Sequence, residues 1–205
     1  MGLSVPGEGQ TSSISATEEP RGALERSLVD SYRKLARLFG HLLSEQSLDS
    51  LLDEVAGALA GLVPYDSLTI YQADETTRIL TPVHAEDQWA EEVLASSMPF
   101  GHGITGWAVE HREPVLTNAA HLDPRAQVVP GTPIEPEALI TVPLISREKI
   151  KGALNLYRIG EHAHFTSIEL ELARSFADAA ALAIDNAEIR AALEHQAQTD
   201  ALTGL

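Results

Sequence analysis

The polar and apolar positions near the C-terminus follow a helical period. Thr166 and Glu169 lie three residues apart, the spacing of a capping box in which each side chain satisfies a free backbone donor at a helix start. Residues 170–198 contain neither Pro nor Gly, which predicts one long helix. The stretch 176–184 is apolar except for Asp178, so this half of the helix requires cover on more than one side.

Beyond residue 185 the apolar positions of this helix narrow to a seam whose spacings alternate between four and three, which is typical of a coiled coil. One polar residue, Asn186, lies inside the seam, as a residue that sets the register of two helices would. The pattern predicts a parallel partner helix. The seam consists of Leu182, Asn186, Ile189, Leu193 and Gln196.

A second heptad pattern lies near the N-terminus. We expect residues 1–20, rich in Gly, Ser, Thr, Pro and Glu, to form a disordered tail, because they offer too few apolar side chains to offset the entropy of ordering. We expect residues 21–44 to form a dimerisation helix, although packing of its C-terminal half on the chain's own sheet fits the pattern equally well. The apolar seam consists of Leu24, Leu28, Leu35, Leu38 and Leu42.

The middle of the chain changes from a helical period to a period of two. After Ser47 one apolar helix face continues to Pro64, where the helix should end. Residues 67–72 and 79–84 then alternate as two strands of an antiparallel hairpin, and residues 86–96 return to a helical pattern. The helix face after Ser47 consists of Leu48, Leu51, Leu52, Val55, Leu59 and Leu62.

A glycine-spaced loop at residues 98–109 leads into a short helix and an extended segment. Residues 118–137 form a long loop with four Pro, and loops of that length in compact domains tend to be functional. Residues 139–145 and 151–158 are predicted strands on either side of a turn. This order of elements indicates an α+β domain with a central antiparallel sheet and long N- and C-terminal signalling helices.

Composition narrows the classes of function. The chain has 205 residues, of which 44% are hydrophobic, and no apolar run approaches the eighteen or so residues that span a bilayer. The N-terminus lacks the features of a secretory signal, so we expect a cytoplasmic protein. A formal net charge of -16 argues against nucleic-acid and anionic-membrane partners. The absence of Cys excludes disulfides and thiol chemistry.

No sequence motif indicates catalysis. The chain lacks Gly-x-Ser-x-Gly, a P-loop and His-Glu-x-x-His, so we predict that this chain is not itself an enzyme. Gly101, Gly103 and Gly106 have the spacing of a dinucleotide fingerprint but belong to no βαβ unit. We interpret them as turn glycines beside a pocket.

Polar residues alternate with the aliphatic set on the central strands and could form a ligand pocket. Leu68, Ile70, Leu154 and Leu156 should face the helices, which leaves Thr69, Tyr71, Asn155 and Tyr157 for the opposite face. An internally hydrogen-bonded polar layer is an equally good interpretation of these four residues. The remaining wall candidates are His84, Trp89, Phe100, Trp107, Asn118 and Thr141, although core packing is the commoner role of Trp.

Several short motifs, taken in order, resemble a GAF domain. They are Gly101-x-Gly103-Ile104-x-Gly106-Trp107-Ala108-Val109, then Pro114-Val115-Leu116, Val142-Pro143-Leu144, Gly152-Ala153-Leu154 and Phe165. The resemblance covers residues 45–190. It implies a six-stranded sheet with the terminal helices on one face and a small-molecule pocket on the other face, under the long loop.

Cofactor binding is weakly indicated. GAF domains that bind cyclic nucleotides carry Asn-Lys and then Phe-x-x-x-Asp-Glu, whereas this chain has Arg158-Ile159, Phe165, Glu169 and Leu170 at those positions. This departure argues against cyclic nucleotides. His162 and His164 could bind a metal, and His84, His102 or His121 could ligate haem, but such isolated histidines are usually exposed loop residues. We therefore predict no cofactor.

The end of the chain resembles a second family. Asp200-x-Leu202-Thr203-Gly204-Leu205, directly after a long helix, is similar to the entry of a GGDEF domain, the catalytic module of diguanylate cyclases. We interpret residues 191–199 as a coiled-coil linker helix and residues 200–205 as the start of that domain, whose signature would lie downstream.

These resemblances imply a GAF regulatory domain that forms a homodimer through its terminal helices and controls a diguanylate cyclase making cyclic di-GMP. A small molecule would bind one helix arrangement better than another. Two alternatives stay open: a ligand-free structural dimerisation module, and a GAF sensor of another output such as a histidine kinase.

Overall fold

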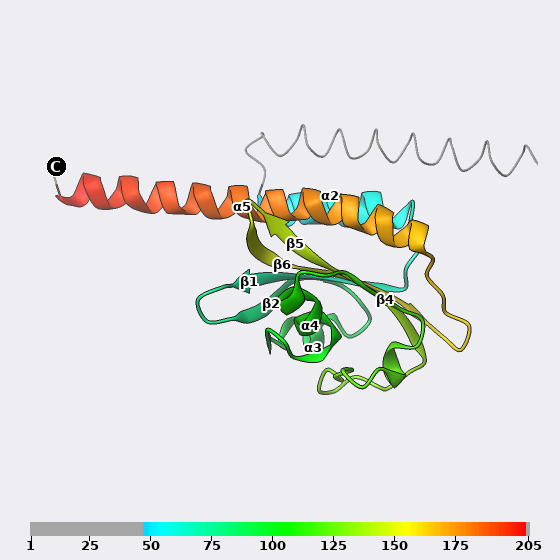
Figure 1. Cartoon of the computed structure of the whole chain (residues 1–205). Helices are drawn as coiled ribbons and strands as arrows, with labels where there is room; N and C mark the ends of the chain where they lie inside the picture. Colours follow the sequence, from blue (N-terminus) through cyan, green and yellow to red (C-terminus); the bar gives the residue numbers. More distant parts are fainter. Residues whose placement is uncertain (1–46, 204–205) are drawn as a thin grey trace, which may run out of the picture.

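The computed structural model describes residues 47–203, which form a curved six-stranded sheet with helices on both faces (Figure 1). Neighbouring strands are antiparallel, in the spatial order β3-β2-β1-β6-β5-β4. The predicted α+β class and six-stranded sheet are confirmed. The strands are β1 (Ser67–Asp74), β2 (Ile79–Glu86), β3 (Met98–Pro99), β4 (Val115–Thr117), β5 (Glu137–Ser146) and β6 (Lys149–Ile159).

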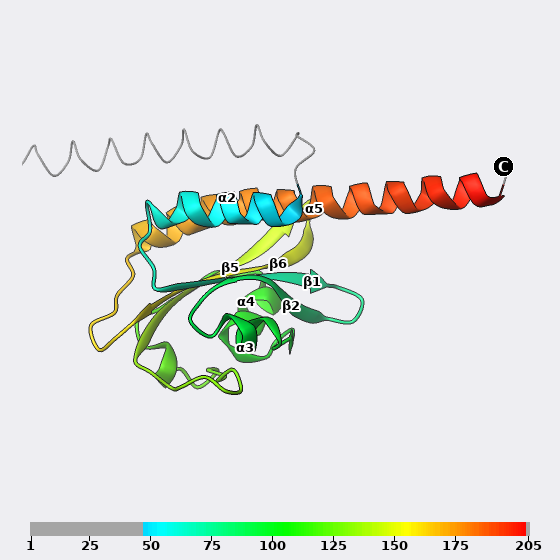
Figure 2. The same cartoon turned by 180° about the vertical axis from the view of Figure 1, so that it is seen from behind.

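The helices divide between the two faces of the sheet. On one face α2 (Leu48–Ala60) and α5 (Ser167–Thr203) lie side by side (Figures 1 and 2). The smaller α3 (Ala90–Leu94), α4 (Gly103–His111) and 3₁₀ helix η1 (Ala120–Leu122) lie over the other face. None of the helices within residues 47–203 has the length and apolar character that crossing a bilayer requires.

Some predictions concern residues beyond this range. The N-terminal tail and the predicted dimerisation helix, with Leu28, Leu35, Leu38 and Leu42, lie outside the described residues, as do residues 204–205.

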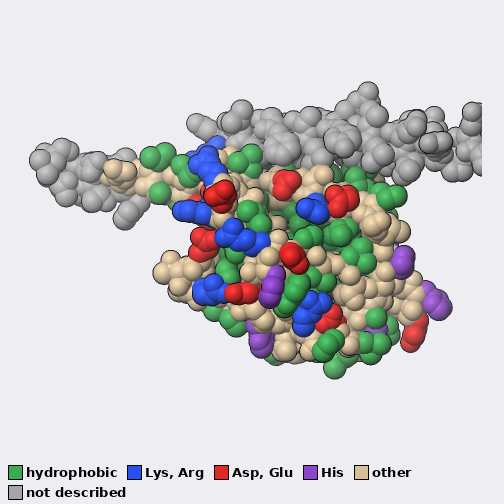
Figure 3. Space-filling model, in the orientation of Figure 1, with side chains coloured by type: hydrophobic (Ala, Val, Ile, Leu, Met, Phe, Trp, Pro, Cys, Tyr) green, Lys and Arg blue, Asp and Glu red, His purple; other side chains and the backbone are tan. Residues whose placement is uncertain are grey.

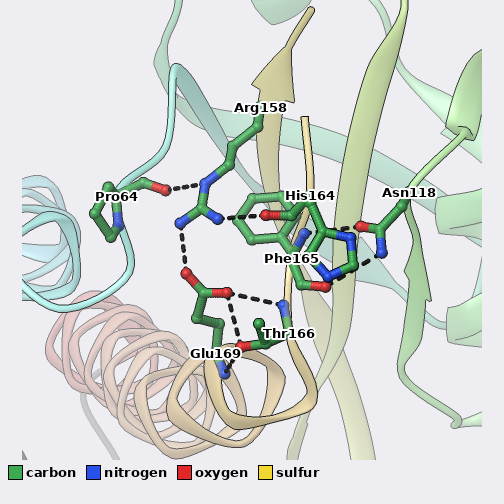
Figure 4. A network of polar contacts seen from close by, with 7 residues as sticks. All are labelled: Pro64, Asn118, Arg158, His164, Phe165, Thr166 and Glu169. Atoms are coloured by element: carbon green, nitrogen blue, oxygen red, sulfur yellow. Dashed lines mark hydrogen bonds and ion pairs between the residues drawn. The ribbon is translucent and has the colours of Figure 1, made fainter. Parts of the chain in front are cut away.

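Helix α5 begins at the predicted capping box (Figure 4). The backbone N–H of Thr166 donates to Glu169 Oε2 at 2.8 Å, and the backbone N–H of Glu169 donates to Thr166 Oγ1 at 3.3 Å. Arg158 on β6 then donates to Glu169 Oε1 and to the carbonyl oxygens of Pro64 and His164. These contacts fix the start of α5 beside the C-terminal end of β6.

The main core lies between the sheet and helices α2 and α5. As predicted, the aliphatic residues of β1 and β6 face this layer, and the apolar half of α5 is buried around Phe176. Most of its other buried positions are Ala, whose small side chains let the helix backbone approach the sheet closely. The strand residues of this core include Leu68, Ile70, Ile140, Leu144, Leu154 and Leu156.

Several predicted boundaries were wrong by a few residues. Helix α2 ends at Ala60, with Gly61 as its C-cap, and so stops before Pro64. Strand β2 continues to Glu86 because it stays paired with β1, and α3 begins only at Ala90, after the side chain of Asp87 accepts the backbone N–H of Trp89. Helix α5 passes residue 198 and continues to residue 203, because the chain has no Pro or Gly before Gly204.

The turn between β5 and β6 has two residues, Arg147 and Glu148, and both have positive φ, at 49° and 64°. A two-residue hairpin of this kind follows the twist of the strands, but it normally uses Asn or Gly because a Cβ atom is unfavourable there. The tight hairpin therefore carries a local conformational cost.

We predict that Glu148→Gly raises the free energy of unfolding by about 0.5–1 kcal/mol. The free energy gained by removing the unfavourable φ of a residue with Cβ exceeds the larger entropy cost of ordering Gly on folding. Urea denaturation measures the difference. Glu148→Ala is the matched control, since it removes the same side chain but keeps Cβ, and it should bring little gain. Equal effects of the two substitutions would contradict the explanation.

Candidate functional site

The long loop at residues 118–136 lies over the face of the sheet opposite α2 and α5 (Figure 1). Residues of this loop and of the sheet enclose a cavity. The cavity has two adjoining compartments of about 280 Å³ and about 300 Å³. They share Tyr71 from β1, Tyr157 from β6, Glu137 from β5 and residues 126–129 from the loop. These volumes suit a small metabolite.

The sheet supplies hydroxyl groups to the first compartment. Ser67, Thr69 and Tyr71 alternate along β1 and line it, and each has 4% or less of its surface exposed. None of the three hydroxyls has a hydrogen-bond partner among the described residues. Burial raises the pKa of Tyr71 to about 12, so its hydroxyl is neutral at physiological pH. The three hydroxyls face the space of the cavity and are therefore available to a ligand.

Two residues predicted for the pocket lie behind its wall instead. Asn155 and Thr141 face each other across β6 and β5, on the same side of the sheet as Thr69, but neither lines a compartment. The Nδ2 amide of Asn155 donates to Thr105 Oγ1 at 2.8 Å and to the Tyr157 hydroxyl at 2.9 Å. Asn155 thus positions two lining residues and belongs to the polar layer that was the alternative interpretation.

Four other predicted wall residues lie elsewhere. His84 is placed on the helix-covered side, where Nδ1 is 3.3 Å from Asp53 of α2. Phe100 packs under Arg78, and Trp107 stacks on His111, so both serve local packing. Asn118 exchanges two hydrogen bonds with the backbone of Phe165 and anchors the segment before α5 (Figure 4). None of the four lines either compartment, because spacing along the sequence does not reveal which neighbour a side chain contacts.

Trp89 does line the first compartment, as the sequence suggested. Its Nε1–H is buried without a hydrogen-bond partner in the described part of the chain. The residues that the sequence analysis missed are Asp87, Glu135 and Glu137, which place three carboxyl groups around the same space. The available signal was the place of Glu137, two residues before the strand predicted from residue 139 and hence near the rim of the sheet.

The glycine-spaced loop has the structural role that we predicted. Gly101 and Gly103 have φ of 76° and 68°, and a Cβ on Gly106 would lie 2.7 Å from the carbonyl oxygen of Pro99. Strand β3 before this loop pairs antiparallel with β2, so no βαβ unit is present here. The first turn of α4 lines the second compartment through His102, Gly103, Ile104 and Thr105.

A model described as "GAF domain" matches residues 45–185 of this chain. The chain belongs to the GAF domain family. Among curated proteins, none matches it significantly.

Solved structures show the same fold at low identity. The GAF domain of a phosphoenolpyruvate-protein phosphotransferase from Coxiella burnetii is 21% identical over 80% of this chain and 98% of that chain, with a TM-score of 0.69. Free methionine-R-sulfoxide reductase from Neisseria meningitidis is 18% identical over 87% and 97%, with a TM-score of 0.64. The second GAF domain of DevS from Mycobacterium smegmatis is 22% identical over 72% and 99%, with a TM-score of 0.57.

In this GAF domain the positions that correspond to the cyclic-nucleotide motif make structural contacts. Arg158 forms an ion pair with Glu169, at 2.5 Å between Nη2 and Oε1, and its guanidinium lies 4.2 Å from the centre of the Phe165 ring (Figure 4). Burial opposes the charged form of Glu169, but the hydrogen bonds from Arg158 and Thr166, together with the charge of Arg158, outweigh it and keep the pKa of its carboxyl below the ordinary value. The motif position therefore stabilises the start of α5.

Metal binding has no geometric support in the part of the GAF domain that the structure describes. Within residues 47–203 no three His, Asp or Glu side chains are grouped as metal ligands. His162 and His164 are exposed, whereas His121 Nδ1 accepts the backbone N–H of Glu137 at 3.3 Å.

A buried ion-pair cluster joins α5 to the sheet where the helix leaves it. Lys151 Nζ on β6 lies 2.6 Å from both Asp185 Oδ1 and Glu188 Oε2, and Arg147 lies 3.3 Å from Asp185. In Figure 3 basic and acidic side chains gather at this junction. The hydrogen bond from Lys151 lowers the pKa of Asp185. Burial disfavours the charged form of Lys151, yet its two carboxylate partners outweigh this and raise its pKa.

We predict that Lys151→Met lowers the free energy of unfolding by about 3 kcal/mol at pH 7, because it leaves the Asp185 carboxylate buried without its main partner. Because the pKa of Asp185 is depressed, the pair stabilises the fold above the ordinary carboxyl value of 3.8 and loses this contribution as the pH falls through the lower folded value. The difference between the two proteins should therefore shrink in acid.

Urea denaturation between pH 2.5 and pH 7 measures both effects. Lys149→Met is the matched control, since Lys149 is exposed on the same strand and the change should stay within about 0.5 kcal/mol. A pH-independent difference for Lys151→Met would show that lost packing, rather than the ion pair, causes the destabilisation.

Proposed function

We propose that this GAF domain is the sensory part of a cytoplasmic diguanylate cyclase, in which a small molecule bound under residues 118–136 changes the arrangement of two α5 helices in a homodimer. The observation that carries the proposal is the course of α5. It is a single helix from the core of the domain to Thr203, and the residues that follow its packed half resemble the entry to a GGDEF domain. The diguanylate cyclase would convert GTP to cyclic di-GMP.

The sheet offers a short route from the cavity to α5. Alternate residues of β1 point to opposite faces, so Thr69 and Tyr71 line the cavity while Leu68 and Ile70 pack in the core beneath α5. A ligand that shifts β1 or β6 therefore also shifts the surface on which α5 rests. The Lys151 cluster holds α5 to β6 at the point of departure, so strand movement would reach the free part of the helix.

The dimer proposal rests on the far half of α5. Leu193 is 61% exposed, and a partner helix along the seam with Asn186 and Ile189 would cover it. Leu182 packs against the buried cluster of Leu51 and Ala183, so this member of the seam already contributes to the chain's own fold. A partner would thus begin its contact near Asn186. A cyclase that joins two GTP molecules across two subunits requires such a dimer to bring its catalytic domains face to face.

The rival functions keep the fold and change the use of the cavity or the helix. A structural dimerisation module would leave the cavity without a ligand, and the hydroxyls of β1 that line it would then meet only solvent. Another output domain is compatible with the GAF fold, since one structural relative is described as a GAF domain/HD domain protein. Native mass spectrometry of the purified chain tests for a retained ligand, and production of cyclic di-GMP from GTP by the full-length protein tests the output.

We predict that Asn186→Leu changes the oligomeric state of the 205-residue chain, because a polar residue in the seam specifies two-stranded register and its loss admits other assemblies. Analytical ultracentrifugation should show a dimer for the unchanged chain and a mixture or a larger species for the variant. In the full-length protein, basal cyclase output should change several-fold.

Ala191→Leu is the control for this prediction, since Ala191 is exposed on the side of α5 away from the seam. It adds the same apolar side chain and should leave both measurements as they were. If Asn186→Leu likewise altered neither assembly nor output, the seam would have no role in signalling.

A further inference from the structure

We propose that the cavity under residues 118–136 binds a small organic compound that carries a protonated amine, held by the carboxylate of Glu137 between the aromatic rings of the wall. The inference rests on the proposed sensory function and names the chemical class of its ligand. It follows from three separate features of the cavity: its charge, its unpaired hydroxyls and its aromatic lining.

The lining is mainly acidic, and the only side chains of the described residues there that can become positive are His121 and His102. Asp87, Glu135 and Glu137 line the first compartment, and neither compartment is lined by a Lys or an Arg of the described chain. Glu137 also lines the second compartment, so it lies at the junction of the two. Its carboxylate makes no hydrogen bond or ion pair within the described residues. An anionic ligand would meet repulsion here, whereas a cation would complete a charge pair.

The arginine of the covering loop is already engaged. Arg125, in the covering loop, donates through Nε and Nη2 to the two carboxylate oxygens of Asp123 at 2.9 Å and 2.7 Å. Its guanidinium also lies 4.6 Å from the centre of the Trp107 ring. This bidentate pair neutralises Asp123 and keeps the positive charge of Arg125 outside the cavity, which leaves the other three carboxylates for a ligand.

Burial makes the free carboxylate of Glu137 unfavourable. Desolvation raises its pKa, the nearby His121 opposes this, and the negative charges of Glu135 and Asp87 raise it further. A carboxyl group of this kind destabilises the empty protein above its ordinary pKa, and a bound cation would relieve that cost. Sites that sacrifice stability in this way are commonly binding sites.

The remaining wall suits an ammonium group. Tyr71 and Tyr157 line both compartments and Trp89 lines the first, so aromatic rings are available for cation–π contact. An ammonium group has N–H donors that the Glu137 carboxylate does not bind, and the hydroxyl oxygens of Ser67, Thr69 and Tyr71 can accept hydrogen bonds from them. An ammonium has three donors and no acceptor, which matches this set of unpaired oxygens.

The second compartment differs from the first in being lined by the start of helix α4. The first turn of α4, at Gly103 to Thr105, lines it, and the backbone N–H groups of a first helical turn have no partner within the helix. They favour a hydrogen-bond acceptor on the part of the ligand remote from the amine. The experiment therefore includes a probe with an amine at one end and a carboxylate at the other.

Four probes with a four-carbon chain separate the possibilities by charge alone: 1,4-diaminobutane, 4-aminobutanoate, 1,4-butanediol and succinate. Isothermal titration of the 205-residue chain at pH 7.5 and 0.15 M NaCl measures affinity. We expect heat of binding from one or both amines and none from the diol or succinate. A preference for 4-aminobutanoate would assign the acceptor end to α4. Binding of succinate alone, or binding of neither amine, would overturn the inference.

Glu137→Gln tests the residue that holds the amine. It should weaken amine binding about ten- to a hundredfold, because a charge-assisted hydrogen bond is lost. The same variant should melt at a temperature equal to or above that of the unchanged chain at pH 7.5, which shows that it is folded. Glu113→Gln is the matched control, since Glu113 is exposed and lines neither compartment, and it should change neither property. Unchanged affinity in Glu137→Gln would overturn the role of Glu137.

The proposed helix relay and the proposed amine ligand can be refuted independently of each other. A chain that is dimeric and responds to Asn186→Leu, but binds no amine, keeps the sensory scheme and loses the ligand class. A chain that binds an amine through Glu137 and stays monomeric at high concentration keeps the ligand class and loses the helix relay.

Discussion

Strands β1 and β6 are covered on both faces, and the rest of the structure depends on this constraint. A strand in that position must satisfy two environments with alternate residues. On β1, Leu68 and Ile70 complete the core beneath α5, while Thr69 and Tyr71 meet the cavity. The same backbone therefore borders the cavity and supports α5. No separate connecting element is needed for one to influence the other.

Helix α5 is attached to this sheet at both ends of its packed half. The capping box and Arg158 hold its start, and the Lys151 cluster holds the point where it leaves. Between them, buried Ala and Phe176 allow close contact with the strands. An element held in this way moves with the sheet as one body, so small displacements at the cavity can become a larger displacement at the free end of a long helix.

The candidate site could be predicted only in part. Thr69, Tyr71 and Tyr157 followed from strand alternation, because direction along a strand is a local property. The positions of His84 and Asn118 did not follow, since each contacts a partner far away in the sequence, Asp53 and Phe165 respectively. The acidic lining escaped notice because Asp87, Glu135 and Glu137 are unremarkable in a chain of net charge -16 and become a cluster only when the loop folds over the sheet.

By itself the sequence determined the period of each element, the cap of α5, the glycine turn before α4 and membership of an α+β class, because these depend on neighbours a few residues apart. Tertiary structure alone decided which side chains enclose a space, which hydroxyls lack partners and which charges go unpaired. Those properties depend on residues that burial brings together from distant parts of the chain. For this GAF domain, local chemistry specifies the scaffold, and long-range packing creates the acidic cavity.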